Sequence, residues 1–408
     1  MIAIDEPYGQ GKVVTIVNIL VRIAVFVGVF GLIAGCSNPA DTSQEESLPV
    51  AEESSAGVAD AELAAELARD PRLALFAPLP SLMVSKNNPI TLAKVNLGRK
   101  LYYDARLSRN HDVSCNTCHL LDKYGVDGLA TSVGHLKQAG GRNAPTVYNA
   151  AGHVAQFWDG RSPDIEDQAK GPPLNPIEMA MANEAAVEAV LNSMPGYVAL
   201  FAAAFPEDEA PVSFDNMARA IGAFERGLVT PSQFDDYLAG DDAALSETEV
   251  AGLIAFLDAG CGTCHSGPYV GGAMYQKLGL VKPWDRDADQ GRFDATGVEA
   301  DRQFFKVPSL RNIAETSPYF HDGSVKSLND AVRLMADHQL GIPVTNEQVI
   351  SIIAFLNALT GEVDPAYIAK PVLPESSEST PVPDPSPALD PDPVENLTTA
   401  PDQTPEPV

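Results

Sequence analysis

Two Cys-x-x-Cys-His motifs, Cys115–His119 and Cys261–His265, constrain this chain more than any other feature. Thiols separated by two residues lie on one helical turn, where both can add to the vinyl groups on one edge of a haem, and the adjacent histidine can bind the iron. The rival interpretations are a four-cysteine zinc site and a pair of redox dithiols. Zinc does not need a histidine after each pair, and dithiols usually accompany a βαβ pattern, whereas this chain shows little strand pattern. The motifs therefore predict two covalently attached haem c groups.

The fifth cysteine, Cys36, follows an apolar run at residues 23–34. The run is shorter than the roughly 20 residues that a membrane span needs, but it suits the core of a signal peptide. Its end resembles a bacterial lipobox, so we predict a lipoprotein signal peptide over residues 1–36, with lipidation at Cys36. An uncleaved anchor helix is the alternative. Either arrangement predicts a periplasmic protein that is tethered to a membrane.

Two acidic segments flank the part of the chain that we expect to fold. Residues 37–60 carry six acidic residues and residues 371–408 carry eight, and neither segment contains Lys or Arg. The second segment also has eleven prolines and few large apolar side chains, so it cannot bury enough surface to offset its conformational entropy. We expect a flexible acidic linker over 37–60 and a disordered tail over 371–408.

The net charge of the whole chain is −28, which excludes a nucleic-acid partner because such binding requires a basic surface. Part of this charge belongs to the two acidic segments, but residues 61–370 remain acidic. This acidity could steer a basic electron-donor protein, or it could be the ordinary charge of an exported protein.

Helical periodicity surrounds both haem motifs. Apolar residues at helical spacing predict a helix over Leu92–Tyr103, before the first motif, and a capping box at Ser246 and Glu249 begins a helix over 246–259, before the second. Gly98, inside the first helix, could allow a close helix crossing. Further apolar residues at helical spacing predict one more helix after each motif, at residues 214–224 and 349–359.

The chain also contains an internal repeat, because residues 144–169 align without gaps on residues 307–332. A repeat of this kind indicates a duplicated domain. We therefore predict a mainly α fold with few strands, in which two cytochrome c-like haem domains pack in tandem. The expected boundaries are 61–228 for the first haem domain and 229–370 for the second.

Several further motifs are specific enough to indicate a family. Besides the two haem motifs they are Val126–Gly128, Thr131–His135, Arg142–Thr146, Phe157–Arg161, Gln168–Pro172, Leu310–Asn312 and Pro318–His321. Together they resemble the bacterial di-haem cytochrome c peroxidases over residues 75–365. The resemblance implies that the first haem is the peroxide site and that the second haem receives electrons.

The resemblance also implies the iron ligands. His119 and His265 match the proximal ligands of the first and second haem. His135 matches a distal ligand that blocks the first iron in the resting oxidised state, although without the resemblance it would be taken for a loop histidine. Met335 matches the distal ligand of the second haem, where a thioether raises the reduction potential. Met335 as a core residue and His338 as a rival ligand are the alternatives.

Other site residues follow from the same resemblance. Glu178 and Gln168 match a distal-pocket pair, and a carboxylate there can move a proton between the two peroxide oxygens. Trp158 matches a tryptophan between the haems that assists electron transfer, although a buried Trp is more often part of a core. A calcium site between the domains is implied for three residues that supply oxygen ligands, Asn143, Thr316 and Pro318.

The expected function is reduction of hydrogen peroxide to water with electrons from a small cytochrome c or copper protein. One alternative is a di-haem oxidase that matures a quinone cofactor in a partner protein, but those relatives have a tyrosine where Met335 stands. Another is a di-haem electron carrier without turnover, against which Glu178 and Gln168 argue. Members of the family tend to form homodimers, although no residue of this chain indicates one.

Overall fold

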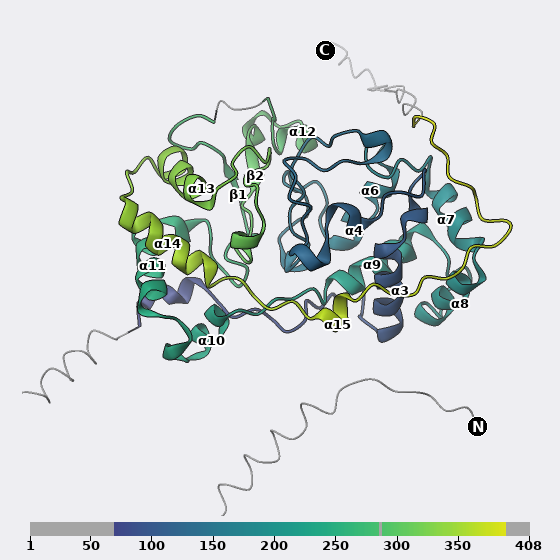
Figure 1. Cartoon of the computed structure of the whole chain (residues 1–408), viewed down its shortest axis with the longest axis horizontal. Coiled ribbons are helices and arrows are strands. Elements are labelled where there is room, and N and C mark those ends of the chain that lie inside the picture. The colour runs from purple at the N-terminus through teal and green to yellow at the C-terminus, as the bar shows by residue number, and fades with distance from the viewer. Residues whose placement is uncertain (1–68, 285–287, 389–408) are drawn as a thin grey trace, which may run out of the picture. The chain divides into compact units, whose positions relative to one another are not determined.

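The structure is a computed structural model that describes residues 69–284 and 288–388. The predicted signal peptide, Cys36 and the acidic linker lie outside the described residues, as does the tail beyond residue 388. The described chain is mainly helical, as predicted (Figure 1). Its strands are β1 (Tyr275–Lys277) and β2 (Phe304–Lys306), which pair antiparallel with Tyr275 opposite Lys306.

The first half, residues 92–228, is built around the crossing of two long helices. Gly98 on one of them lies against the backbone of Ala220 on the other, so closely that a Cβ at position 98 would lie 1.9 Å from the Ala220 carbonyl oxygen. The predicted close crossing at Gly98 is therefore confirmed. The helices of this half are α3 (Leu92–Tyr103), α4 (Cys115–Cys118), α5 (Ile165–Gln168), α6 (Gly171–Leu174), α7 (Glu184–Asn192), α8 (Pro195–Ala204) and α9 (Phe214–Glu225).

The second half, residues 229–370, repeats this arrangement. Gly252 lies against the backbone of Ser351 in the same way, and a Cβ there would also lie 1.9 Å from a carbonyl oxygen. The helices that were predicted to flank the second motif are confirmed as α11 and α14. The helices of this half are α10 (Gln233–Ala239), α11 (Glu247–Asp258), α12 (Phe293–Thr296), α13 (Leu328–Leu334), α14 (Asn346–Asn357) and α15 (Pro365–Ile368).

The internal repeat is visible in the backbone. Asn149 and Asn312, which the repeat aligns, both have left-handed backbone angles, with φ of 62° and 61°. Their side-chain amides donate to the same hydroxyl, that of Thr230, over 2.8 and 2.9 Å. Thr230 lies at the junction of the two halves, so the two copies of the repeat meet there. The shared geometry supports the interpretation of the two halves as a duplication.

Each half has its own hydrophobic core, but the ends of the described chain are exchanged between them. The first core draws its buried residues from 97–228, and the second from 234–359 together with Phe76. Val363, Tyr367 and Ile368, which follow the second core in sequence, pack on the first one. Each half is therefore held in part by a segment from the other end of the chain.

The first part of the predicted tail departs from the expectation of disorder. Residues 371–388 run as an extended segment along the first half, past α3, α8 and α7 (Figure 1). Lys100 and Arg106 donate to its backbone carbonyls, at Val372 and Pro374. Its prolines restrict the backbone in advance, so ordering it costs less entropy than its composition suggested.

No single helix in the described ranges is long and apolar enough to cross a membrane. Helices α7 and α8 are long and apolar enough only when the two are counted together, and the chain bends sharply between them. Val187, Leu191, Tyr197 and Phe201 of these helices are fully buried in the first core. Their apolar character therefore serves packing within the protein.

Candidate active site

The first Cys-x-x-Cys-His motif forms a single helical turn with its histidine at the end. Cys115 and Cys118 are free thiols at the two ends of α4, and His119 ends the turn. Nδ1 of His119 lies 3.3 Å from the carbonyl oxygen of Gly125, to which it can only donate. This hydrogen bond fixes the tautomer and leaves Nε2 available to bind a metal. Burial lowers the pKa of His119, which favours the neutral form that a ligand requires.

The second motif has the same form and faces a cavity. Cys261, Cys264 and His265 all line it, and Met335 lines it as well. Met335 follows α13 directly and begins a wide helical turn over Met335–Leu340. The residues found here fit a haem c: two free thiols, a histidine whose pKa is lowered to about 4 by burial, and a thioether.

His338, the rival to Met335, is placed differently. It is not among the residues that line the cavity of the second motif. Its Nδ1 lies 3.1 Å from the carbonyl oxygens of Lys282 and Pro283, and its ring packs edge-on against Trp284. The geometry therefore favours Met335 over His338 as a ligand.

His135 lies at the tip of a closed loop in the first half. The loop is held by a bridge between Val133 and Ala139, and His135 begins a short turn over His135–Lys137. Leu136 and Lys137 both have left-handed backbone angles, with φ of 53° and 60°. Non-glycine residues rarely adopt this conformation, and it costs about 1 kcal/mol or more at each position. The turn after His135 is therefore strained.

Glu178 is hydrogen-bonded to the His135 backbone and lies within electrostatic range of the first cysteine pair. Its carbonyl oxygen accepts a hydrogen bond from the His135 backbone N–H over 2.8 Å. Its carboxylate interacts electrostatically with Cys115 and Cys118, and Asn175 donates to it over 2.7 Å. Burial raises the pKa of Glu178, an effect that the nearby Arg161 partly offsets. A carboxyl group with a raised pKa can both accept and donate a proton.

Gln168 is less closely involved. It is the last residue of α5 and is half-buried. Among the described residues, no hydrogen bond joins its side chain to Glu178. Its place in the distal pocket stays a prediction.

Trp158 and the three residues predicted to bind calcium meet at the junction of the halves. Trp158, Asn143, Thr316 and Pro318 all line the cavity that also holds Met335. The indole N–H of Trp158 donates to the carbonyl oxygen of Asn143 over 2.9 Å, so these two elements are directly joined. The residues predicted to bind calcium therefore line one cavity, Asn143 from the first half and Thr316 and Pro318 from the second.

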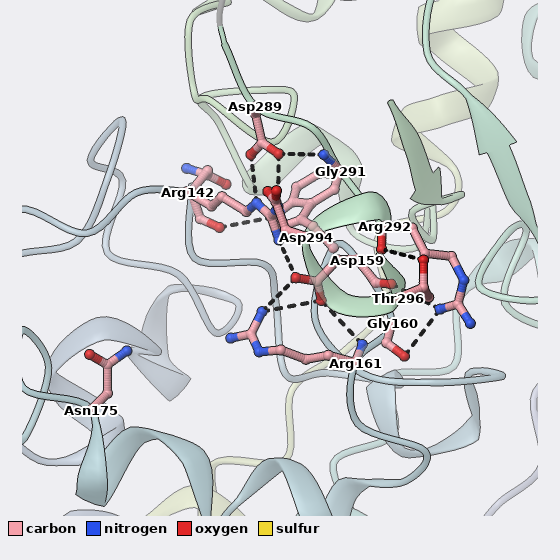
Figure 2. Close-up of polar contacts among 12 residues, drawn as sticks. Arg142, Asp159, Gly160, Arg161, Asn175, Asp289, Gly291, Arg292, Asp294 and Thr296 are labelled. Carbon is pink, nitrogen blue, oxygen red and sulfur yellow. Dashed lines mark hydrogen bonds and ion pairs between the residues drawn. The ribbon is translucent and has the colours of Figure 1, made fainter. Parts of the chain in front are cut away.

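An ion-pair network that the sequence did not indicate crosses the same junction. Arg142 of the first half donates to Asp159 over 2.6 Å and to Asp289 of the second half over 2.6 and 2.8 Å (Figure 2). Arg161 donates to Asp159 as well, and it is the arginine that acts on Glu178. Arg142 and Arg161 both stand in the motifs quoted above, but only the fold shows their partners.

The burial of Lys306 was also not predicted from the sequence. Lys306 is buried in the cavity wall, and its Nζ lies 3.3 Å from Nδ1 of His153. Burial lowers the pKa of Lys306 to about 8. The pattern of β2 gave no signal of this, because a lysine in a strand is ordinarily on the exposed face.

Comparison with known proteins identifies the class. The family model for the di-haem cytochrome c peroxidases matches residues 92–243. The chain is 47% identical to cytochrome c551 peroxidase of Pseudomonas aeruginosa over 325 residues, which cover 78% of this chain and 93% of the relative. It is 35% identical to methylamine utilization protein MauG of Methylorubrum extorquens, over 71% of this chain and 84% of the relative.

A solved structure agrees with the sequence comparisons. The fold resembles that of a MauG-like protein associated with microbial copper homeostasis, with a TM-score of 0.65 and 31% identity over 72% of this chain and 97% of the other. The site described above is thus the di-haem site of a known class. The chain belongs to the di-haem cytochrome c peroxidase family, and its two Cys-x-x-Cys-His motifs are the attachment points of two haem c groups.

Proposed function

We propose that the chain reduces hydrogen peroxide to water at the first haem, with electrons that a small cytochrome c or copper protein delivers to the second. The chain is a cytochrome c peroxidase, an oxidoreductase that acts on peroxide. When bound, the two haem groups supply the iron that binds peroxide and the electrons that reduce it. One observation carries the proposal: the half-buried Glu178 accepts the backbone N–H of His135 at its carbonyl oxygen, and its carboxylate interacts electrostatically with both cysteines of the first motif.

Glu178 is the proposed acid and base of the reaction. A carboxylate beside peroxide can take the proton from one oxygen and give it to the other, which makes water a leaving group. The burial that raises the pKa of Glu178 strengthens the basicity of its carboxylate, and Asn175 fixes its orientation. We propose Gln168 as a second polar group of the same pocket.

His135 is proposed as a removable ligand that controls access to the first haem. The strained turn at Leu136 and Lys137 supports this role, because strain of this kind allows two positions of similar energy. Displacement of His135 would leave room for peroxide at the first haem. His119, which would hold the iron of the first haem, keeps its tautomer through its hydrogen bond to Gly125.

The second half is the proposed electron entry. His265 and Met335 line one cavity, and a histidine–methionine pair raises the reduction potential relative to two histidines. Trp158 lines the same cavity while belonging to the first half, so its indole ring is suited to couple the two sites. The Met335 thioether also separates this chain from enzymes that place a tyrosine there.

The remaining parts of the proposal concern calcium, partners and location. Asn143, Thr316 and Pro318 line one cavity at the junction of the halves, which supports a calcium ion bound by oxygen ligands. Bacterial cytochrome c peroxidases are periplasmic, and we propose that Cys36 carries a lipid that tethers this one to a membrane. The moderate acidity of the folded part would favour a basic donor protein. A homodimer is proposed from the family alone.

The experiment that tests the gate replaces His135 with Gly in the haem-loaded protein. Oxidation of a reduced small cytochrome c by hydrogen peroxide is followed before and after one-electron reduction, in the presence of calcium. We expect the wild type to become active only after reduction and the variant to be active in both states. A variant that still requires reduction would refute the gate, and a wild type inactive in both states would refute the peroxidase assignment.

A further inference from the structure

The extended C-terminal segment, residues 371–388, ends at the distal histidine. Its carbonyl at Ser386 lies 2.9 Å from Nε2 of His135. A carbonyl oxygen only accepts, so Nε2 must carry the proton and donate it. His135 is fully buried, and its other nitrogen, Nδ1, is enclosed without a hydrogen-bond partner among the described residues. The structure thus shows His135 with one nitrogen occupied by the C-terminal segment.

A series of contacts guides the C-terminal segment to this point. Beyond the carbonyls that accept from Lys100 and Arg106, the Ser377 hydroxyl donates to the carbonyl of Ser193 over 2.7 Å. The Ser193 hydroxyl donates to Thr380 over 2.9 Å. These contacts spread over three elements of the first half, so the path of the segment is defined along its length.

The last anchor is Arg109, which lies beside the distal pocket. Its guanidinium donates to the Asp384 carboxylate over 3.0 Å and to the Ser386 hydroxyl over 3.1 Å. The Asp384 backbone N–H donates to the Arg109 carbonyl over 2.9 Å, and the Arg109 N–H donates to Met179 over 2.8 Å. Because Met179 follows Glu178, which accepts from His135, the segment closes a ring of hydrogen bonds around the distal loop.

We propose that the C-terminal segment is a positioning element that holds His135 away from the first haem iron. While the segment is docked, neither nitrogen of His135 is available to iron: Nε2 donates its proton to Ser386, and Nδ1, which then holds the lone pair, is enclosed by the protein. Release of the carbonyl at Ser386 frees Nε2 for coordination. Docking of the segment therefore favours the open, peroxide-accessible form. The inference rests on the proposed role of His135 as a removable ligand.

The size of the effect follows from the contact that is lost. One neutral hydrogen bond contributes about 1 kcal/mol, which is about a fivefold change in the ratio of the two positions of His135. The anchors at Arg109 and the docked backbone raise the local concentration of the Ser386 carbonyl and so add to this. A measurable change in the ligation of the first haem is expected.

The test compares two truncations of the haem-loaded protein in its oxidised state. A chain that ends at Val382 lacks Asp384 and Ser386, and the matched control ends at Ala388 and keeps every contact described above. We expect the shorter chain to show at least an about fivefold higher ratio of low-spin to high-spin first haem in electron paramagnetic resonance spectra, and faster amide exchange at residues 134–138. Asp384→Asn should also raise the low-spin to high-spin ratio and the amide exchange at residues 134–138, but by less than the Val382 truncation does.

The outcomes are distinct. An unchanged or lower low-spin fraction in the Val382 chain, with the control like the wild type, would overturn the proposal; a lower fraction would mean that the segment supports ligation. If His135→Gly leaves the low-spin signal of both chains unchanged, His135 is not a ligand and the gate of the proposed function fails instead. In that case amide exchange at residues 134–138 still shows whether the segment holds the loop. Equal exchange in the Val382 chain and the control would overturn this part of the proposal too.

Discussion

The buried ion pair of Arg311 and Asp235 allows a quantitative test of how the second haem site is held. Arg311 is 1% exposed and donates to both carboxylate oxygens of Asp235, over 2.6 and 2.9 Å. It also donates twice to the carbonyl of Pro268, over 3.0 and 2.8 Å. Pro268 follows His265 by three residues, so this arginine supports the loop after His265.

The expected cost depends on which partner is removed. Arg311→Met leaves Asp235 with backbone donors at Leu79 and Ser232, whereas Asp235→Asn leaves a buried guanidinium without its anion. Breaking a buried pair from one side costs about 3–5 kcal/mol of unfolding free energy, so we place Arg311→Met near the lower value and Asp235→Asn near the upper. The double variant Arg311→Met/Asp235→Leu leaves no buried charge. It should cost less than the sum of the single changes by at least about 1 kcal/mol.

The assay is urea unfolding of the haem-loaded protein, followed by far-UV circular dichroism and by haem absorbance. Arg302→Met is the matched control, because its ion pair with Glu299 lies on the surface and should leave the midpoint unchanged. Haem absorbance should report earlier loosening in Arg311→Met than circular dichroism does, since the loop at Pro268 loses its donor. Single variants that each cost under about 1 kcal/mol, or costs that simply add in the double variant, would refute the reasoning.

Two further predictions concern the helix crossing and calcium. Gly98→Ala places a Cβ 1.9 Å from the Ala220 carbonyl oxygen and should lower the unfolding free energy by about 1–3 kcal/mol in the same urea assay, whereas Gly141→Ala, which meets nothing within 4 Å, should not. Removing calcium with a chelator should abolish peroxidase activity after reduction, and added calcium but not magnesium should restore it, since magnesium gives up its waters reluctantly and is usually bound through carboxylates, which the predicted ligand set lacks. Asn143→Ala should raise the calcium concentration needed for half-maximal activity, and unaltered calcium dependence would contradict the assignment of this ligand.

The sequence predicted what short-range patterns determine. The helix over Leu92–Tyr103 has the predicted ends, because Thr91 caps its first turn and its apolar spacing ends before Asp104. The repeat was also found, because a duplicated backbone keeps the same residues at positions with unusual angles, such as Asn149 and Asn312. The helix pattern is local and the repeat is found by comparing the chain with itself, so one sequence suffices to recognise both.

The contacts between distant segments were not predictable in the same way. Arg142 and Asp289 are 147 positions apart, and no spacing rule connects them. The C-terminal segment was assigned to disorder because of its proline and acid content, yet its contacts use backbone carbonyls, serine and threonine hydroxyls and the Asp384 carboxylate. Such acceptors are present in any sequence, so their use depends on donors such as Arg106 and Arg109 being placed along the path. Only the fold supplies that information.

The chain after Gly361 connects the second half to the first. Gly361, at the end of the second half, donates its N–H to Asn312 over 2.9 Å, and the chain then crosses to pack Tyr367 on Phe224 of the first half. The same stretch continues into the segment that reaches His135. The segment that contacts His135 is therefore covalently continuous with the second half and packs on the first half along its way. In the proposed gate, the strained turn after His135 makes the balance between the two proposed positions of this histidine sensitive to its contact with Ser386.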